Sequence, residues 1–499
     1  MTPPFPNSYW LEPDRILCGE YPRYFDDLGD HEGMTAILGA GVRVFIDLTE
    51  EDELKPYTSI ALENADKLGI DPGDLEFHRH PIRDISVPRN RGEMRAILRR
   101  IRLARHQGKT VYLHCWGGRG RTGTVAGCAL RDLFGLDGDD ALFLLSERWQ
   151  ACAKSELSES PETEEQRGFV RSINPVKSRK NQIRGALLGA AVGDALGVPV
   201  EFAGREARKN DPVTDMREFG THHQPIGTWS DDTSMILATM EGLVSAETWS
   251  PNAVMEEFSL WLKEAKHTPH GKVFDIGNAT REAIQRYGDG TNPLKCGGTS
   301  DWSNGNGSLM RILPVGLAYA NDPNLVEKAS ELSSLTHAHE RSRMSCAFYC
   351  LVVSELLHGE DLTRATSFAW EVMDHHWNFT PGERAHFDRW QPEQLFARDE
   401  TEIGSSGHVV DTLEAALWVN ARHNNYRDAV LHAVNLGDDT DTTGCVAGGL
   451  AGLIHGEKSI PAEWLEVLVK REELTTIAKC FAEFSVQEDR ALSAPLSDI

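Results

Sequence analysis

The sequence predicts two domains of different fold class: an α/β domain with a central, largely parallel sheet, followed by an all-α domain. Strand-like and helix-like segments alternate through about the first 174 residues, which is typical of a small parallel sheet. From about residue 181, long helical patterns with few convincing strands replace that alternation. We therefore expect domains over residues 1–174 and 181–499, joined by a polar linker over residues 175–180.

Length and composition agree with two soluble globular domains. A chain of 499 residues exceeds the size at which a single core stops growing, about 250–300 residues. Most of the formal net charge of −25 lies in the second domain, so nonspecific binding to nucleic acid is not expected. The nine cysteines form no zinc-type pairs, and no signal peptide or apolar stretch of membrane-spanning length is expected. The expected location is the cytoplasm, with no membrane partner.

Periodicity predicts the elements of the first domain. The expected strands cover residues 42–48, 75–80 and 109–114, and the expected helices cover residues 91–107, 121–134, 138–150 and 161–172. The last of these helices is expected to carry Pro161 in its first turn.

Glycines recur every four residues in two segments of the second domain. The first segment contains Gly185, Gly189, Gly193 and Gly197, and the second contains Gly444, Gly448 and Gly452. Glycine costs up to about 1 kcal/mol at a helical position, so repeated glycines on one face predict that helix backbones approach closely there.

A glycine-rich loop after the 109–114 strand has the composition of a phosphate site with a reactive thiol. In His114-Cys115-x5-Arg121-Thr122, backbone N–H groups of the loop and the following helix N-terminus would bind an anion and stabilise a thiolate. Arg121 offers a planar fork for phosphate oxygens, Thr122 is placed to bond the sulfur, and Asp84 could protonate a leaving group. The remaining residues expected at the phosphate are Trp116, Gly117, Gly118, Arg119 and Gly120.

These features resemble the dual-specificity branch of the protein tyrosine phosphatases. The resemblance rests on the cysteine loop, the upstream Pro81-Ile-Arg-Asp84 segment and the closing Pro161–Gln166 helix start. It implies that Cys115 is the nucleophile, Arg121 the phosphate binder and Asp84 the general acid, without a cofactor. Cys18, Cys128 and Cys152 are expected to be structural, although a protective disulfide between one of them and Cys115 stays open.

Two carboxylate clusters mark the second domain, each at a predicted helix start. Ser230, Asp231 and Asp232 form the first, and Asp439, Asp441 and Thr442 form the second. Helix capping by Ser230 and a favourable interaction of the acids with the helix dipole would alone account for the first cluster. The recurrence of such a cluster favours a pair of divalent cations instead, Mg²⁺ before Mn²⁺, because oxygen ligands suit hard ions and adjacent carboxylates repel without them.

The second domain resembles the ADP-ribosylglycohydrolase family, which includes the enzyme that reactivates ADP-ribosylated dinitrogenase reductase. The shared motifs run in order from Gly193–Gly197 with Glu201, through Gly227–Thr233, Phe274–Asn278, Asn304–Gly307 with Met310-Arg311, and Thr336-His337, to Gly437–Thr442. The resemblance implies an all-α fold with a two-metal centre held by Ser230, Asp231, Asp232, Asp439, Asp441 and Thr442. Glu201 would transfer a proton.

The same resemblance implies several substrate contacts. The residues expected to contact substrate are Asp194, His337 and the loop of Asn304, Gly305, Asn306 and Gly307, whose backbone N–H groups would approach a pyrophosphate. For Glu201 and His337 an ordinary helix-end acid and a core histidine remain alternatives, and Gly271 and Asp275 are weaker candidates for lining the site.

The sequence therefore predicts a bifunctional hydrolase. One half would release phosphate from a protein or small molecule through a phosphocysteine, and the other would cleave the N- or O-glycosidic link of ADP-ribose to its acceptor with two divalent cations. Two alternatives stay open: a phosphatase acting on a phosphorylated nucleotide or ADP-ribose metabolite, or one half that only binds phosphate or ADP-ribose.

Overall fold

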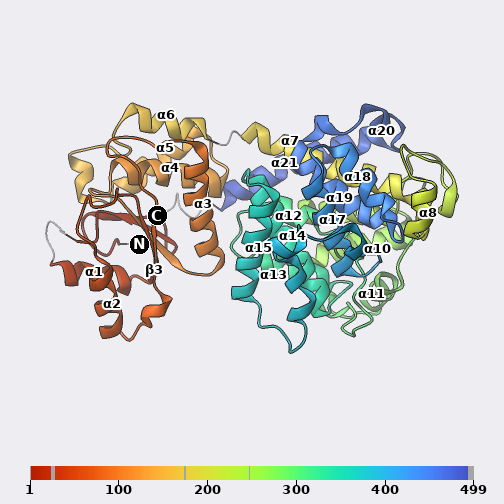
Figure 1. Cartoon of the computed structure of the whole chain (residues 1–499), viewed down its shortest axis with the longest axis horizontal. Coiled ribbons are helices and arrows are strands. Elements are labelled where there is room, and N and C mark those ends of the chain that lie inside the picture. The colour runs from red at the N-terminus through yellow and green to blue at the C-terminus, as the bar shows by residue number, and fades with distance from the viewer. Residues whose placement is uncertain (1, 24–28, 174–175, 247, 493–499) are drawn as a thin grey trace. The chain divides into compact units, whose positions relative to one another are not determined.

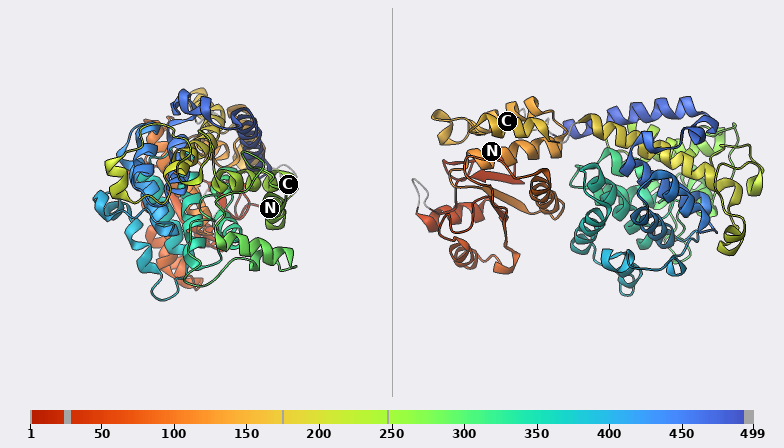
Figure 2. Two further views of the ribbon diagram at one scale, coloured as in Figure 1. Left: turned by 90° about the vertical axis from the view of Figure 1, so that its right-hand side faces the viewer. Right: turned by 45° about the horizontal axis from the view of Figure 1, so that its top comes forward.

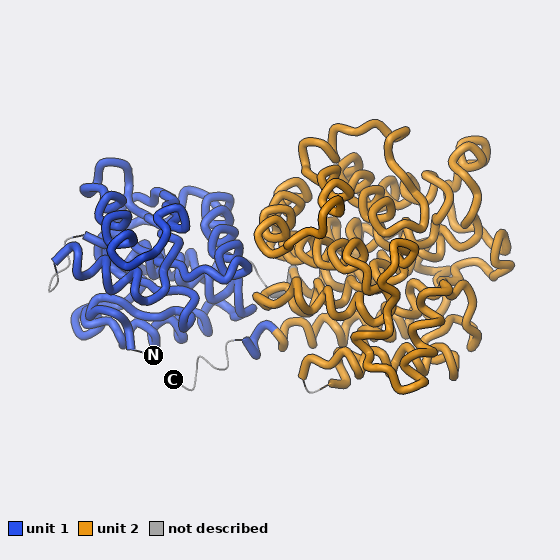
Figure 3. The backbone as a smooth tube through the Cα atoms, turned by 90° about the horizontal axis from the view of Figure 1, so that it is seen from below, with its two compact units in different colours: residues 1–176, 489–499 blue, residues 177–488 orange. Residues whose placement is uncertain are grey.

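The computed structural model describes residues 2–23, 29–173, 176–246 and 248–492 and divides into two compact units (Figure 3). Unit 1 contains Met1–Val176 and Asp489–Ile499, and unit 2 contains Lys177–Glu488. Each unit is described by itself below. Figure 1 labels most of the helices and strand β3, and Figure 2 shows the same elements from two further sides.

A five-stranded sheet in the order β1-β2-β5-β3-β4 forms the centre of unit 1. Its strands are β1 (Ser8–Glu12), β2 (Ile16–Gly19), β3 (Val42–Asp47), β4 (Glu76–Arg79) and β5 (Thr110–His114). The β1–β2 pair is antiparallel, and the other three pairings are parallel. The predicted parallel sheet is confirmed, whereas the short β1 and β2 strands, almost entirely buried and without alternation, had no sequence signal.

Helices cover both faces of this sheet. They are α1 (Asp30–Gly39), α2 (Thr58–Lys67), α3 (Arg91–His106), α4 (Gly120–Phe134), α5 (Gly138–Trp149) and α6 (Glu164–Ser172). Phe45 of β3 packs with α1 and α2, while its neighbours Val44 and Ile46 pack with α3 to α6, as the two-residue period of a strand requires. The alternation places the carboxyl ends of β3 and β5 between two helical layers.

The last helix of unit 1 begins later than its sequence predicts. Thr163 caps α6, since its hydroxyl accepts from Gln166 N at 3.2 Å while Gln166 Oε1 accepts from Thr163 N at 3.1 Å. This capping box starts the helix at Glu164, so Pro161 lies before the first turn rather than within it.

Unit 2 is helical, as predicted. Its helices are α7 (Val176–Gly197), α8 (Arg205–Asn210), α9 (Asp231–Ser245), α10 (Pro251–Glu264), α11 (Asn278–Gly288), α12 (Leu313–Ala318), α13 (Leu325–Ser334), α14 (Glu340–Leu357), α15 (Leu362–His376), α16 (Pro392–Leu395), α17 (Val409–Arg422), α18 (Tyr426–Asn435), α19 (Thr440–His455), α20 (Ala462–Val467) and α21 (Arg471–Ala491). In the described part of the unit, β-pairing is limited to isolated bridges such as Gly305 with His408.

The two glycine series bring α7 and α19 into direct backbone contact. A Cβ built on Gly185 would lie 2.4 Å from the carbonyl oxygen of Gly452, and one on Gly193 would lie 2.0 Å from that of Gly444. A Cβ on Gly197 would lie 2.3 Å from Asp441 Cα. The predicted close approach is confirmed, and the antiparallel pairing brings the end of α7 to the start of α19.

The α7 segment also corrects two expectations. Residues 176–180, assigned to a polar linker, are the first residues of α7. The helical segment Arg179–Val200 is long and apolar enough to cross a membrane, with a mean hydropathy of 1.4, whereas no stretch of that kind was expected from the sequence. Because 94% of its apolar stretch is buried inside the structure, the segment has the burial of a core helix.

Candidate active sites

Cys115 lies at the base of a cavity of about 470 Å³ in unit 1, called here the cysteine cavity. The residue follows β5 directly, and α4 begins five residues later at Gly120. The sheet therefore carries the thiol to the carboxyl edge of β5, where the helix N-terminus faces it. The cavity is lined by Asp84, Ile85, Cys115, Trp116, Gly117, Arg119, Gly120, Arg121, Lys154, Leu157, Ser158 and Glu162.

The backbone of the cysteine loop is held from outside. The carbonyl oxygens of Trp116 and Arg119 accept from Tyr21 N at 2.8 Å and from Ser160 Oγ at 2.8 Å. Gly118 has a φ of +72°, and a Cβ there would lie 2.6 Å from the backbone of Gly19, so only glycine fits. Outward-bonded carbonyls and a left-handed residue are features of an anion-binding nest.

Arg121 joins the elements around the cavity. Its Nη1 and Nη2 donate to the two carboxylate oxygens of Glu53 at 2.8 and 2.7 Å, and Nη2 lies 3.1 Å from Asp84 Oδ1. The guanidinium holds the pKa of Glu53 below its usual range. The structure therefore brings Asp84 and Arg121 together beside Cys115, as predicted. Glu53 was missed, although it lies in an acidic run that follows β3 at the same sheet edge.

His114 and Thr122 lie close to Cys115 in the sequence, and both side chains are buried. His114 is fully buried beneath the loop, with Nε2 2.9 Å from the Tyr57 hydroxyl, and burial lowers the pKa of His114 to about 4. It is therefore neutral at physiological pH. The Thr122 hydroxyl is buried without a hydrogen-bond partner among the described residues, so its expected bond to the Cys115 sulfur is not formed.

The cysteines form no disulfide. All nine lie in described segments and are free thiols, and Cys18, Cys115, Cys128 and Cys152 are buried. Burial raises the pKa of Cys18 and of Cys128 above the range in which thiolates form near neutral pH. Cys18 and Cys128 therefore match the structural assignment, and no bridge to Cys115 is present in this structure.

Unit 2 contains a second cavity, of about 410 Å³, called here the carboxylate cavity. The starts of α9 and α19, 209 positions apart in the sequence, meet at it. It is lined by Glu201, Phe202, Asp231, Asp232, Asp275, Ile276, Gly277, Asn278, Ala279, Thr280, Trp302, Gly305, Asn306, Gly307, Met310, His337, Asp439 and Thr442. Most of the residues predicted for the metal and substrate sites are thus brought together.

The electrostatics of the carboxylate cavity fit divalent cations. Burial and mutual repulsion raise the pKa values of Asp231, Asp232 and Asp441 well above the usual range. Asp232 Oδ2 and Asp439 Oδ1 are buried and have no hydrogen-bond partner among the described residues. Unpaired carboxylate oxygens at this depth need a proton or a cation, and the all-oxygen donor set suits hard ions.

Ser230 and Asp194 support the first cluster from below. Ser230 Oγ accepts from Asp232 N at 3.2 Å and caps α9, and neither Ser230 nor Asp194 lines the cavity. Asp194 is completely buried and accepts from Ser230 N at 2.9 Å and from Thr233 N at 3.0 Å. The expected contact of Asp194 with substrate is not supported by this position. Asp194 instead fixes the backbone that carries Asp231 and Asp232.

Glu201 lies at the cavity wall beside two residues that could share its proton. His222 Nε2 is hydrogen-bonded to Glu201 Oε2 and lies 3.7 Å from Asp275 Oδ2. The three side chains form a compact cluster, as do Glu201, Asp439 and Asp441. Burial raises the pKa of Glu201 to about 8. His222 was missed because its motif, Thr221-His222-His223, lies in a short loop without helical or strand periodicity.

The Asn304–Gly307 loop closes the cavity but differs from expectation in detail. Asn306 N donates to Gly407 O at 3.0 Å, so this N–H is not available for a pyrophosphate. Its side-chain Nδ2 donates instead to Asp439 Oδ2 at 3.0 Å. Asn304 does not line the cavity, and its Nδ2 donates to Asp301 O. Gly305 and Gly307 line the cavity together with His337.

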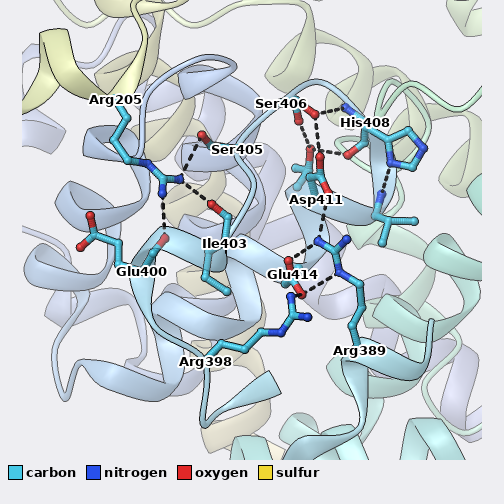
Figure 4. A network of polar contacts seen from close by, with 12 residues as sticks. Arg205, Arg389, Arg398, Glu400, Ile403, Ser405, Ser406, His408, Asp411 and Glu414 are labelled. Atoms are coloured by element: carbon cyan, nitrogen blue, oxygen red, sulfur yellow. Dashed lines mark hydrogen bonds and ion pairs between the residues drawn. The ribbon is translucent and has the colours of Figure 1, made fainter. Parts of the chain in front are cut away.

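An arginine holds the backbone behind the second cluster. Arg205 Nη1 donates to Glu400 O at 2.7 Å and Nη2 to Ile403 O at 2.6 Å (Figure 4). Its Nε donates to Leu436 O at 3.0 Å. Leu436 directly precedes the turn that carries Asp439. The Arg205 side chain thus links the start of α8 to the 400–403 segment and to Leu436, just before Asp439.

Two further arginines, Arg389 and Arg398, anchor the other end of the same segment. Arg389 Nε and Arg398 Nη1 donate to Glu414 Oε1 at 2.8 and 2.9 Å, and Arg389 also pairs with Asp411 at 3.0 Å (Figure 4). Asp411 in turn accepts from Ser406 Oγ at 2.8 Å. Ser405 O accepts from Asp439 N at 3.1 Å. Arg205 on one side and Arg389 with Arg398 on the other therefore support the position of the second carboxylate cluster.

Comparison with known proteins assigns each half. The ADP-ribosylglycohydrolase family matches residues 175–490, and the family described as Swiss Army Knife protein, DSP-PTPase phosphatase domain, matches residues 6–173. Both are hydrolase families. ADP-ribosylglycohydrolases are metal-dependent.

Similar proteins share the second half. An ADP-ribosylarginine hydrolase, Tri1, from Serratia proteamaculans (strain 568) is 32% identical over 63% of this chain and 82% of its own length. The ADP-ribosyl-[dinitrogen reductase] glycohydrolase of Rhodospirillum rubrum is 32% identical over 58% and 90%. A solved ADP-ribosylglycohydrolase-related protein complex is 31% identical, covers 62% of this chain and 99% of its own, and has a TM-score of 0.53. The chain belongs to the ADP-ribosylglycohydrolase family and carries a DSP-type phosphatase domain ahead of its glycohydrolase domain.

Proposed function

We propose that the chain is a bifunctional hydrolase in which unit 1 removes phosphate through Cys115. The thiolate would attack phosphorus, forming the S–P bond while the ester P–O bond breaks, and Asp84 would give its proton to the leaving oxygen. Asp84 would then take a proton from the water that attacks the phosphocysteine and releases inorganic phosphate. The convergence of Cys115, Arg121 and Asp84 in one cavity is the observation that supports this reaction.

Arg121 would bind phosphate oxygens during both steps. Its guanidinium has five N–H donors, of which Glu53 takes one on Nη1 and one on Nη2. Nη1 also donates to Ile82 O at 3.2 Å and Nη2 lies 3.1 Å from Asp84 Oδ1, so an incoming phosphate would displace Glu53 or Asp84 from the fork.

Unit 2 is proposed to cleave an ADP-ribosyl link with two divalent cations, Mg²⁺ before Mn²⁺. Asp231, Asp232, Asp439, Asp441 and Thr442 would hold them, with Ser230 and Asp194 fixing the first cluster. When bound, such ions supply Lewis acidity and lower the pKa of water. Hydrolysis would break the anomeric C–N or C–O bond to the acceptor and form a C–O bond to water, and Glu201, hydrogen-bonded to His222 at the cavity wall, would take the proton of that water or give a proton to the leaving acceptor.

The acceptor is proposed to be arginine. Relatives at 32% identity are ADP-ribosylarginine hydrolases. Among the residues that line the carboxylate cavity, none is lysine or arginine. Glu201 and Asp275, with the exposed ring of Phe202 beside them, offer carboxylates and a π-face that suit a guanidinium.

A two-panel assay of the full-length protein tests both activities. One panel contains phosphorylated peptides, nucleotides and sugars, and the other contains ADP-ribosylated arginine, serine and small-molecule acceptors. Cys115→Ser should abolish phosphate release and spare ADP-ribosyl hydrolysis, while Asp232→Ala or chelation should do the reverse.

Each half of the assay has an outcome that would contradict the proposal. Unchanged phosphatase activity in the Cys115→Ser protein would exclude the phosphocysteine. Full ADP-ribosyl hydrolysis in a demonstrably metal-free sample would exclude the two-cation site. Preference for a serine link over an arginine link would overturn the acceptor assignment alone.

A further inference from the structure

The Thr336 hydroxyl is hydrogen-bonded to two side chains, Arg311, which can only donate, and His337, which can donate or accept. Arg311 Nη2 donates to Thr336 Oγ1 at 2.8 Å, and His337 Nδ1 lies 2.9 Å from the same oxygen. A guanidinium has no acceptor, so the hydroxyl proton cannot point towards Arg311. His337 Nδ1 is the one remaining partner recorded for this hydroxyl among the described residues, so Nδ1 accepts the proton.

A neutral imidazole that accepts at Nδ1 must carry its own proton on Nε2. His337 lines the carboxylate cavity, and no hydrogen bond to its Nε2 is recorded in the described structure. Two glycines leave room around that nitrogen, since a Cβ on Gly305 or Gly307 would lie 3.6 or 3.4 Å from it. The geometry therefore leaves the Nε2–H free for a ligand.

Among the described residues, Arg311 has no carboxylate partner that would explain its burial. Its guanidinium is completely buried, lies 4.5 Å from the centre of the Phe258 ring and also donates to Leu332 O at 3.1 Å. Its Nε and Nη1 have no hydrogen-bond partner among the described residues. Burial and this neighbouring charge lower the pKa of His337 to about 3, so the ring stays neutral across the physiological range.

We propose that Arg311 and Thr336 are positioning residues that fix His337 as the Nε2–H tautomer and thereby present a neutral donor to an acceptor oxygen of the ADP-ribosyl ligand. The ligand rests on the proposed function of unit 2, whereas the tautomer follows from the hydrogen-bond pattern alone. A neutral donor suits a site that already gathers many charges, because it can bind an oxygen without competing for the carboxylates.

The test uses the full-length protein labelled with ¹⁵N-histidine, with the His337 signals assigned by their loss in His337→Gln. Wild type and Thr336→Ser should show Nδ1 as the bare nitrogen and Nε2 as the protonated one at pH 6 to 8. Thr336→Val removes the hydroxyl proton and should give mixed tautomers. Calorimetry with ADP-ribose should show weaker binding for Thr336→Val in proportion to the remaining Nε2–H fraction, roughly twofold if the two tautomers are equally populated, and unchanged binding for Thr336→Ser.

Three outcomes would overturn the proposal: an Nδ1–H tautomer or an imidazolium in wild type at pH 7, the same tautomer and affinity in Thr336→Val, or no ADP-ribose binding by wild type. The wild-type spectrum decides the tautomer even if Thr336→Val fails to fold. Hydrolysis of ADP-ribosylarginine is measured separately, because its absence would contradict the proposed function without changing the histidine spectrum.

Discussion

Gly193→Ala tests whether the contact between α7 and α19 holds the active centre of unit 2 together. The added Cβ would lie 2.0 Å from the carbonyl oxygen of Gly444 and 2.6 Å from its carbonyl carbon, whereas ordinary contacts begin at 3.4 Å. The helices would have to separate locally by roughly 1.4 Å. Both obstructing atoms are backbone, and Gly189 and Gly197 are equally crowded on either side, so a rotamer change cannot relieve the overlap.

The expected cost follows from this geometry. Overpacking of a tightly packed contact destabilises by about 1–3 kcal/mol, and we take the upper end because the obstructing atoms at Gly193 are backbone atoms. Because alanine is more favourable than glycine in a helix by up to about 1 kcal/mol, the net loss in the free energy of unfolding is roughly 2 kcal/mol. For a domain of this size the unfolding midpoint should fall by roughly 4 °C. Asp441 lies against Gly197, so divalent cation binding should weaken as well.

The assay is thermal unfolding of the full-length protein, following the transition of unit 2 by calorimetry. Gly288→Ala is the matched control, because Gly288 ends α11 and an added Cβ would meet nothing closer than Lys263 Nζ at 3.8 Å. Phosphatase activity of unit 1 should be unchanged in both variants. If Gly193→Ala melts at or above the temperature of wild type and binds cations equally well, the proposed role of the helix contact is wrong.

Three further predictions address the two cavities. Arg205→Ala removes the donor to three backbone carbonyls behind Asp439, so the affinity for Mg²⁺ or Mn²⁺ measured by calorimetry should fall roughly tenfold. Arg205→Lys should recover part of that affinity. Equal cation affinities in wild type and Arg205→Ala would refute the role of Arg205. Asp84→Asn should slow alkyl phosphates by about 100-fold but p-nitrophenyl phosphate much less, and equal slowing of both would exclude Asp84 as the acid. The raised pKa of Glu201, about 8, means that folded metal-free protein binds this proton more tightly than unfolded protein, so its stability should fall as pH rises from about 4.5 to 8. Denaturant midpoints at pH 5 and pH 8 measure this change in stability. Saturating Mg²⁺ should reduce the difference between the two midpoints. A metal-free protein that is more stable at pH 8 than at pH 5 would contradict the raised pKa of Glu201.

Local patterns predicted the parts of each site whose chemistry is contiguous in the chain. The Cys115–Thr122 loop carries its thiol, glycines and arginine within eight residues, between a strand and a helix that both have clear periodicity. The acidic residues of both metal clusters and the glycine spacing of α7 and α19 are equally local signals. Thr122 and Pro161 show the limit of such patterns, since a hydroxyl's partner and a helix's first residue depend on neighbours outside the motif.

Residues that act through long-range contacts escaped prediction. Glu53 reaches Arg121 across 68 positions, His222 reaches Glu201 across an irregular loop, and Arg205 bonds carbonyls about 200 or more positions away. Asp194 was predicted to contact substrate, but its backbone partners place it beneath the cavity. Charge and residue type are the same whether such a side chain lines a cavity or supports its wall.

The sequence by itself determined the two fold classes, the thiol loop and the oxygen-rich clusters, because strand and helix periods and motif spacing are properties of short segments. Only the tertiary structure decided which carboxylates share a cavity and which proton each buried group carries. The hydrogen bonds at Thr336 illustrate the difference: Thr336 and His337 are adjacent in sequence, but the tautomer depends on Arg311, which donates from 25 positions away. Burial and long-range hydrogen bonding set protonation, and both exist only once the chain is folded.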